Sequence, residues 1–188
     1  MLTYALSVAS LGGRLTDGLT AALKQHPPSH GGIWDLEVLP AQWQLDGADP
    51  GRLHDYLRLV EAGVVRAGSI HLPFGGVWDF SSLDEDARRM AIARQRIIIE
   101  QCAPLGAPQL TVHASAEPIE PEAREARLKQ AIRSIKELLP YARCHGMHMA
   151  VEWLPRTCIG NKEEELFAIV EPFSPDEVGI LLDDNHVM

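Results

Sequence analysis

Short apolar stretches alternate with longer segments of helical periodicity along this chain, and the alternation occurs six times. Runs of about four to eight aliphatic residues are typical of strands, and apolar positions three or four apart are typical of helices. The strands are predicted at residues 4–10, 34–40, 68–73, 109–114, 147–154 and 178–183. A strict alternation of strand and helix predicts a parallel sheet whose strands are joined by helical crossovers.

The sequence also contains start signals for some of the helices. Ser82 and Glu85 have the spacing of a capping box, and Asn161 and Glu164 resemble one. In a capping box the first side chain accepts a hydrogen bond from a backbone N–H in the first turn. We therefore expect Ser82 and Asn161 to cap the helices that follow them.

Each predicted strand has one bulky apolar face and one face of small or polar side chains. In the fourth strand, for example, Leu110 and Val112 lie opposite Thr111 and His113. A doubly wound sheet has helices on both sides and should be apolar on both faces, whereas a barrel has all its helices outside. We therefore predict one α/β domain over residues 1–188, an open, incomplete TIM-type (β/α) barrel with six of the eight βα units.

Carboxylate and imidazole side chains gather near the C-terminal ends of the predicted strands, on the inward faces where barrel active sites are found. They are Glu37, His71, His113, Glu152 and Asp183, followed by His186. Such nitrogen and oxygen ligands suit Zn²⁺, Mn²⁺, Co²⁺ or Fe²⁺ better than Ca²⁺. An inward histidine is often only a hydrogen-bonded structural residue, and Glu37 fits either role. Burial of Glu152 and Asp183 is costly unless they are paired or bind a metal, so we predict metal binding for both.

Four motifs resemble the xylose isomerase-like TIM barrel superfamily: SIHLPFG at 69–75, LTVH at 110–113, AVEWLPR at 150–156 and LLDDNH at 181–186. That superfamily contains sugar phosphate isomerases and epimerases, ketose 3-epimerases, inosose dehydratases and endonuclease IV-type apurinic nucleases. The resemblance covers essentially the whole chain, as the first six βα units of the barrel.

In the sugar-acting members, the resemblance implies that Glu152 and Asp183 bind one divalent metal, together with a histidine and a glutamate from strands seven and eight. His186 would contact the substrate, and Arg156 matches an arginine of ketose 3-epimerases. Those epimerases carry an acidic residue two positions after the arginine, where this chain has Cys158. This departure argues against an ordinary ketose epimerase.

The nuclease members instead use histidines as zinc ligands, and His71, His113 and His186 match those positions. The resemblance therefore leaves the branch open. For the sugar-acting branch we assign Glu152 as catalytic residue, Glu152, Asp183 and His113 as metal ligands, and His71, His186, Arg156 and Glu37 as substrate contacts.

The leading functional hypothesis is a metal-dependent isomerase or epimerase that acts on a sugar, a sugar phosphate or a related polyol. A divalent ion (Mn²⁺, Zn²⁺, Co²⁺ or Mg²⁺) would clamp adjacent carbonyl and hydroxyl oxygens while Glu152 moves a proton through an enediolate. One alternative is a zinc phosphodiesterase of the endonuclease IV type. The other is a noncatalytic barrel fragment.

The length of the chain bears on whether it acts alone. A complete (β/α)₈ barrel typically needs about 250 residues, whereas this chain has 188 and stops soon after its sixth predicted strand. We expect a truncated product, or a chain completed by association. Open edges at the first and sixth strands favour pairing with another chain, and Ile180 and Leu182 should be poorly covered. We therefore predict a homo-oligomer that covers the open side.

The net charge and the cysteine content limit the classes of binding partner and the cellular compartments that we expect for this chain. The chain carries 17 basic and 26 acidic side chains, a formal net charge of −9, which disfavours nonspecific binding to nucleic acid. It has no stretch of the roughly 20 apolar residues that a membrane span needs, and no basic start of a secretory signal. Three cysteines without a CxxC pair indicate a reducing compartment. We expect a cytoplasmic protein with a small sugar or polyol substrate.

Overall fold

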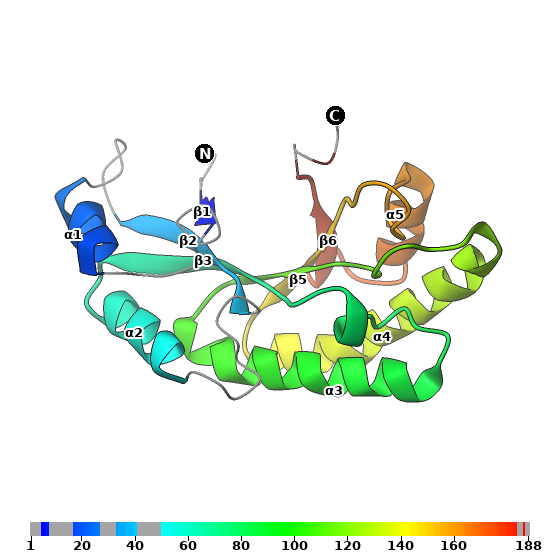
Figure 1. Cartoon of the computed structure of the whole chain (residues 1–188), viewed down its shortest axis with the longest axis horizontal. Coiled ribbons are helices and arrows are strands. Elements are labelled where there is room, and N and C mark those ends of the chain that lie inside the picture. The colour runs from blue at the N-terminus through cyan, green and yellow to red at the C-terminus, as the bar shows by residue number, and fades with distance from the viewer. Residues whose placement is uncertain (1–4, 8–16, 27–32, 41–49, 184–185, 187–188) are drawn as a thin grey trace.

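The computed structural model describes residues 5–7, 17–26, 33–40, 50–183 and 186, and within them six strands alternate with five α-helices (Figure 1). The strands are β1 (Ala5–Ser7), β2 (Trp34–Val38), β3 (Val65–His71), β4 (Gln109–Val112), β5 (His148–Glu152) and β6 (Val178–Leu181). The helices are α1 (Asp17–Gln25), α2 (Pro50–Glu61), α3 (Glu85–Cys102), α4 (Arg124–Cys144) and α5 (Glu163–Val170). Residues 4 and 8–10 of the first predicted strand lie outside the described residues. No helix in the described ranges is both long and apolar enough to cross a membrane.

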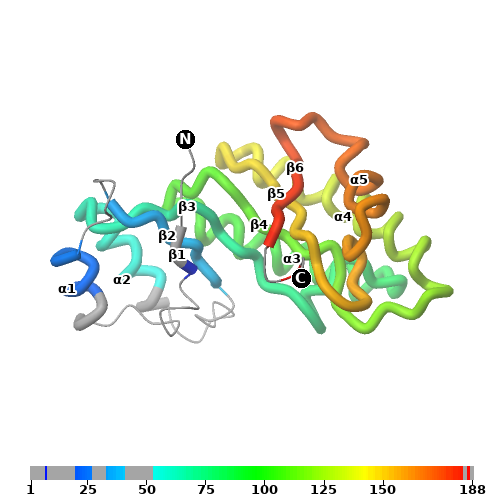
Figure 2. Tube along the Cα trace, turned by 90° about the horizontal axis from the view of Figure 1, so that it is seen from above, coloured from blue at the N-terminus to red at the C-terminus, as the bar shows by residue number. Residues whose placement is uncertain are grey.

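The six strands form one sheet in which every neighbouring pair is parallel and the spatial order follows the chain, from β1 to β6. A doubly wound sheet reverses its strand order at a switch point, whereas a barrel keeps the order of the chain. The predicted barrel-type α/β fold is therefore confirmed. The sheet is open, with β1 and β6 at its two edges, and Figures 1 and 2 show these strands well apart.

The strand faces have the predicted polarity. Cα pairing aligns Val38 with Ile70, Ile70 with Leu110, and Leu110 with Met149, and all four side chains are fully buried. They belong to the core shared with α3 and α4, to which Ile135 contributes. The other face of the sheet consequently carries the small and polar side chains. At the sixth strand the expected lack of cover is confirmed for Leu182, which is 68% exposed, while Ile180 packs partly against the core.

The third strand begins at Val65, three residues before the predicted start. The reason is an irregularity at Gly68: Leu36 pairs with Ala67, but the next residue of β2, Glu37, pairs with Ser69. Gly68 is the additional residue in β3, so Ala67 and Ile70 are both fully buried although they are three positions apart. The irregularity interrupts the period of two in the sequence, which conceals the first part of the strand.

Both predicted capping boxes are wrong in detail. The cap of α3 is Asp84, whose Oδ1 accepts hydrogen bonds from the backbone N–H of Asp86 (3.0 Å) and Ala87 (3.1 Å). Ser82 instead accepts the N–H of Asp84 in the turn before the helix. Helix α5 follows Lys162 without a side-chain cap, and the Asn161 side chain donates to a carbonyl of the preceding loop.

Candidate functional site

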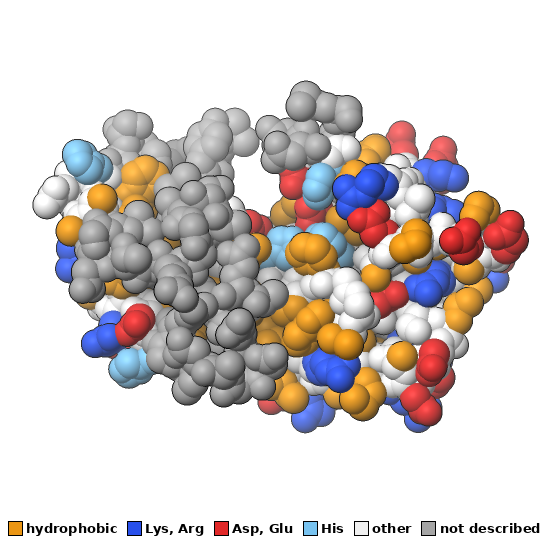
Figure 3. All heavy atoms as spheres, in the orientation of Figure 1, with side chains coloured by type: hydrophobic (Ala, Val, Ile, Leu, Met, Phe, Trp, Pro, Cys, Tyr) orange, Lys and Arg blue, Asp and Glu red, His pale blue; other side chains and the backbone are white. Residues whose placement is uncertain are grey.

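A cavity of about 480 Å³ opens at the C-terminal ends of β3 to β6. Five of the six inward acidic and imidazole residues of the sequence analysis line it: His71, His113, Glu152, Asp183 and His186. Figure 3 shows histidine side chains beside hydrophobic ones near the middle of this face. The strands therefore gather residues that are more than a hundred positions apart in the sequence, and the cavity is the candidate site.

The carboxylate of Glu152 occupies the centre of the cluster and is only 3% exposed. Its Oε2 lies 3.0 Å from Nε2 of His71 and 2.9 Å from Nε2 of His113, and its Oε1 lies 3.2 Å from Nδ1 of His186. Three imidazoles thus surround one buried carboxylate. A carboxylate in such a position requires partners of opposite charge or a cation.

Backbone carbonyls fix the orientation of two of these imidazoles. Nδ1 of His71 lies 3.0 Å from the Leu72 carbonyl oxygen, and Nδ1 of His186 lies 3.0 Å from the Trp153 carbonyl oxygen. A carbonyl only accepts, so each Nδ1 carries the hydrogen and donates it. For His71 this arrangement is typical of metal-binding histidines, because it presents the opposite nitrogen, Nε2, to the cluster. In His186 the nitrogen that bonds the Trp153 carbonyl is also the one nearest to Glu152.

His113 supplies a direct test of whether the cluster fits a metal. Its Nε2 is buried and has no hydrogen-bond partner among the described residues, although the Glu152 oxygen is 2.9 Å away, because the two groups are not aligned. Ligands bonded at about 2.0–2.2 Å to one ion lie roughly 3 Å from each other. The donor atoms, their spacing and the orphaned nitrogen therefore fit a divalent cation.

The electrostatics of the cluster keep Glu152 and His113 in ligand-competent forms and favour the charged form of His71. Burial opposes ionisation of Glu152, but the nearby imidazoles of His113 and His71 outweigh it and hold the pKa of the carboxyl well below its usual range. Burial lowers the pKa of His113, so this ring is neutral. Burial also opposes charging of His71, but Glu152, the Leu72 carbonyl and the charge of Glu37 together raise the pKa of His71.

Asp183 and His186 form a second group of donors on the other side of Glu152. Nδ1 of His186 lies 3.7 Å from Oδ2 of Asp183, and the backbone N–H of His186 donates to the Asp183 carbonyl. The ligand atoms of Glu152, Asp183 and His186 lie within 4.8 Å of one another, as do those of His71, His113 and Glu152. Glu152 is thus shared by two overlapping triads of donors.

The remaining two predicted site residues are placed differently. Glu37 is partly buried on β2 and is not in the cavity lining, but its charge acts on His71. Arg156 lines the cavity with an exposed side chain, and its Nε lies 2.8 Å and 3.0 Å from the two carboxylate oxygens of Glu117. Its φ of 57° is unusual for a residue other than glycine. Most of the charge of Arg156 is therefore neutralised locally.

Sequence reasoning missed Glu117 and also Phe74, whose ring lines the cavity beside the histidines. Both lie in loops after strands, where no periodicity indicates the direction of a side chain. Two signals were available: Phe74 belongs to the motif at 69–75, and each residue follows an inward histidine, His71 or His113, by three or four residues.

An arginine at the start of α4 holds the loop between β5 and α5 that forms one wall of the cavity. Arg124 donates to the carbonyl oxygens of Thr157 (2.9 Å) and Cys158 (2.8 Å) and to Oε2 of Glu165 (2.8 Å). The same Glu165 oxygen accepts the backbone N–H of Gly160 at 2.9 Å. The loop is consequently tied at both of its sides to helices of the scaffold.

The cysteine in this loop is expected to be unreactive. Burial, aided by the charge of Glu117, raises the pKa of Cys158 to about 11, and burial raises that of Cys102 to about 12, whereas Cys144 is exposed. Because the thiolate is the nucleophile, iodoacetamide at pH 8 should alkylate only Cys144 in the native protein, as measured by mass spectrometry. Alkylation in urea should label all three cysteines of the chain. Labelling of Cys158 as fast as Cys144 would contradict the prediction.

Comparison with known proteins agrees with this architecture. The model of a family described as xylose isomerase-like TIM barrel matches residues 35–188. Among solved structures, a D-tagatose 3-epimerase-like protein superposes with a TM-score of 0.78 at 20% identity, over 98% of this chain and 66% of the other. An IOLI protein with a zinc atom gives 0.73 at 20% identity, over 98% and 64%. A D-psicose 3-epimerase with D-tagatose from Clostridium cellulolyticum H10 gives 0.77 at 16% identity, over 98% and 64%.

These structural likenesses concern the fold, since the identities are low. The chain spans about two thirds of the length of these structures or slightly less. No curated protein matches the sequence.

Proposed function

Because the chain belongs to the xylose isomerase-like TIM barrel family, we propose that it acts as a divalent-metal-dependent isomerase or epimerase on a small sugar, sugar phosphate or polyol. The observation that carries the proposal is the buried Glu152 carboxylate, which faces imidazoles of His71, His113 and His186 in a cavity at the C-terminal ends of the strands. The solved structures of ketose epimerases and a zinc-containing protein with this fold support it.

We assign the metal to Glu152, which both donor triads share, together with Asp183 from one triad and His113 from the other, with Mn²⁺, Zn²⁺, Co²⁺ or Mg²⁺ as candidates. Such an ion, when bound, polarises adjacent carbonyl and hydroxyl oxygens and so acidifies the carbon between them. Glu152 is ionised at neutral pH because its pKa is lowered, and this is the form that both a ligand and a proton acceptor need. In the proposed isomerisation Glu152 takes the proton from the carbon beside the carbonyl and returns it to the former carbonyl carbon of the enediolate, while the hydroxyl proton of the first carbon moves to the carbonyl oxygen. An epimerisation requires, in addition, a second acid on the opposite face of the substrate.

The cavity suits a small polyhydroxylated substrate. Its volume of about 480 Å³ lies within the range of about 300–1,000 Å³ that is usual for small-molecule sites. We assign hydroxyl contacts to His71, His186 and Arg156, while Phe74 and Leu154 offer apolar surface to the C–H groups of the substrate. Glu37 acts on the site through the charge that it places near His71.

We also propose that a second copy covers the open side of the sheet. The exposed Leu182, directly after the edge strand β6, supports this arrangement. Analytical ultracentrifugation would measure the mass, and a well-behaved monomer at micromolar concentration would contradict the proposal.

Solvent-exchange NMR tests the reaction most directly. The chain loaded with Mn²⁺ would be incubated in D₂O with D-fructose, D-tagatose and their phosphates. The Mn²⁺ would then be removed with a chelator, and the deuterium content of the sugars would be measured by NMR. We expect metal-dependent deuterium incorporation at the carbon beside the carbonyl, lost in Glu152→Gln and kept in the control Glu164→Gln, which changes an exposed carboxylate of α5. Metal binding without exchange on any of these sugars would favour a noncatalytic barrel, and absence of metal binding would overturn the proposal.

A zinc phosphodiesterase is the second candidate, and one observation favours it. The triad of His71, His113 and Glu152 is the more buried of the two donor groups and contains two of the three histidines that nuclease-type members of the superfamily would use. The pairing of Arg156 with Glu117 counts against it, since it removes a cation from phosphate recognition. Nicking of duplex DNA at an abasic site in low salt would support this candidate, and no nicking with Zn²⁺ present would discard it.

A further inference from the structure

The aromatic ring of Phe74 lies nearly parallel to the imidazole of His113, with ring centroids 4.0 Å apart and an interplanar angle of 20°. We propose that Phe74 is a positioning residue, which holds the His113 ring in the plane that directs Nε2 at a bound divalent cation. This inference deepens the proposed function and rests on the metal binding that it includes.

The misalignment between His113 and Glu152 is the first argument. Their atoms Nε2 and Oε2 are 2.9 Å apart, a distance at which a modest ring rotation would form a hydrogen bond. The terminal torsion of histidine is broad, so the side chain alone does not prevent that rotation. Rotation would, however, break the parallel contact with Phe74. The stack therefore keeps the lone pair of Nε2 available for a cation.

The anchoring of Phe74 is the second argument. The preceding residue, Pro73, accepts a hydrogen bond through its carbonyl oxygen from Nε2 of Gln95 at 2.6 Å. Gln95 is buried on α3, one of the helices that contribute to the core. The loop after β3 is thus fixed to the scaffold, and the ring of Phe74 is placed by backbone contacts rather than by its own burial.

The exposure of Phe74 is the third argument. Its side chain is 52% exposed, so it contributes little to the core, and its ring contacts are with two members of the cluster. In addition to the stack on His113, its ring lies 5.3 Å from that of His71 at an angle of 54°. The ring therefore lies beside the two imidazoles that face Oε2 of Glu152.

Titration with Co²⁺, followed by its visible d–d absorption, tests the inference with a readout other than activity. We expect Phe74→Leu to weaken Co²⁺ binding about tenfold and to change the absorption spectrum, since loss of outer partners of metal ligands has effects of this order. Phe74→Tyr keeps the ring and should bind within about twofold of the parent. The matched control is Phe167→Leu, which removes an equally exposed phenylalanine on α5.

A double-mutant cycle with His113→Ala shows whether Phe74 acts through His113. If it does, Phe74→Leu causes no further loss of Co²⁺ affinity in the His113→Ala background. An unchanged affinity and spectrum in Phe74→Leu, or the same loss in both backgrounds, would overturn the inference while leaving the proposed metal site intact. Absence of Co²⁺ binding by the parent protein would overturn the proposed function itself, and the inference with it.

Discussion

Replacing Glu152 with glutamine is expected to weaken the binding of Mn²⁺ or Zn²⁺ by more than about 100-fold. Loss of a partner that only orients a metal ligand already costs about 10–100-fold, and Glu152 is the member shared by both donor triads. The substitution keeps the shape of the side chain but removes its negative charge. Isothermal titration calorimetry of the metal-free protein measures the change.

The control is Glu164→Gln, which removes the same charge at an exposed position of α5. It should bind metal as the parent does, and this excludes a mere effect of net charge. Retention of parental affinity in Glu152→Gln would contradict the assignment of the site. So would a stoichiometric metal bound elsewhere that Glu152→Gln leaves unaffected.

The same substitution should change the pH dependence of stability in the metal-free protein. Because the fold lowers the pKa of Glu152, the ionised carboxylate stabilises the native state at pH values above its usual pKa of 4.5, and this contribution is lost as pH falls. Because the fold raises the pKa of His71, the protonated imidazole stabilises the native state at pH values below its usual pKa of 6.5, and this contribution is lost as pH rises. The stability difference between parent and Glu152→Gln should therefore be largest between these two pH values, as urea unfolding at several pH values would measure.

The barrel fold could be predicted because strand polarity has a period of two that reflects the geometry of the sheet. In β4, Leu110 and Val112 face the core while Thr111 lies on the opposite face, and the alternation in the sequence records this directly. The first part of β3 could not be predicted, because the irregularity at Gly68 shifts the alternation by one residue. The sequence therefore predicts the bounds of a strand only where the pairing of that strand is regular.

The candidate site could likewise be predicted only in part. Glu152 and His71 lie on strands, so their direction follows from neighbouring apolar residues, and the structure brings them to within 3.0 Å. Phe74 lies in a loop, where its direction depends on the contact between Gln95 and the backbone, and no sequence pattern records such a contact. The donors for a cation could be predicted, whereas the groups that orient these donors could not.

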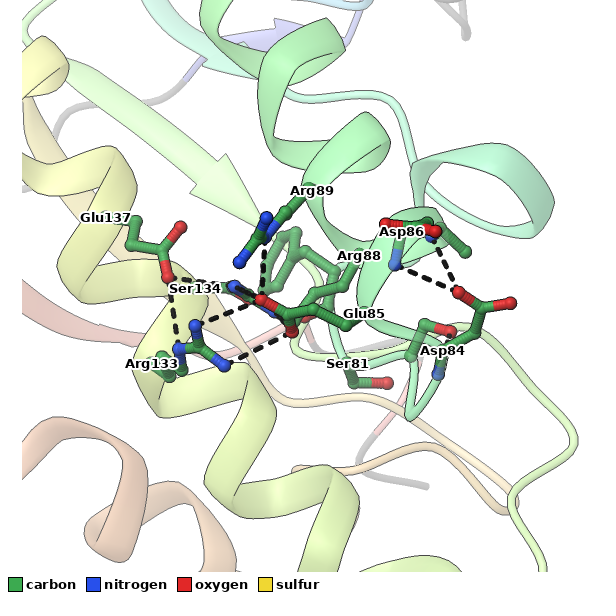
Figure 4. Close-up of polar contacts among 12 residues, drawn as sticks. Ser81, Asp84, Glu85, Asp86, Arg88, Arg89, Arg133, Ser134 and Glu137 are labelled. Atoms are coloured by element: carbon green, nitrogen blue, oxygen red, sulfur yellow. Dashed lines mark hydrogen bonds and ion pairs between the residues drawn. The ribbon is translucent and has the colours of Figure 1, made fainter.

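A buried arginine also connects the two long helices, α3 and α4. Arg88 of α3 is only 1% exposed, and its guanidinium bonds Glu85 at 2.9 and 3.0 Å, Glu137 of α4 at 2.9 Å and the Ser134 hydroxyl at 2.9 Å (Figure 4). Ser134 in turn donates to the carbonyl of Phe80 at 2.6 Å. A charge in the interior is tolerated when its hydrogen-bonding groups are satisfied in this way.

Replacement of Arg88 by methionine should therefore lower the free energy of unfolding by about 2–3 kcal/mol. Breaking a fully buried ion pair costs about 3–5 kcal/mol, and the loss here is smaller because Glu85 and Glu137 are about one third exposed and regain water. Arg89→Met is the matched control, since Arg89 bonds the same Glu85 from a side chain that is 67% exposed. That control should cost less than about 1 kcal/mol. Urea unfolding followed by circular dichroism measures both losses, and equal losses would show that burial of Arg88 adds nothing to the contact between the helices.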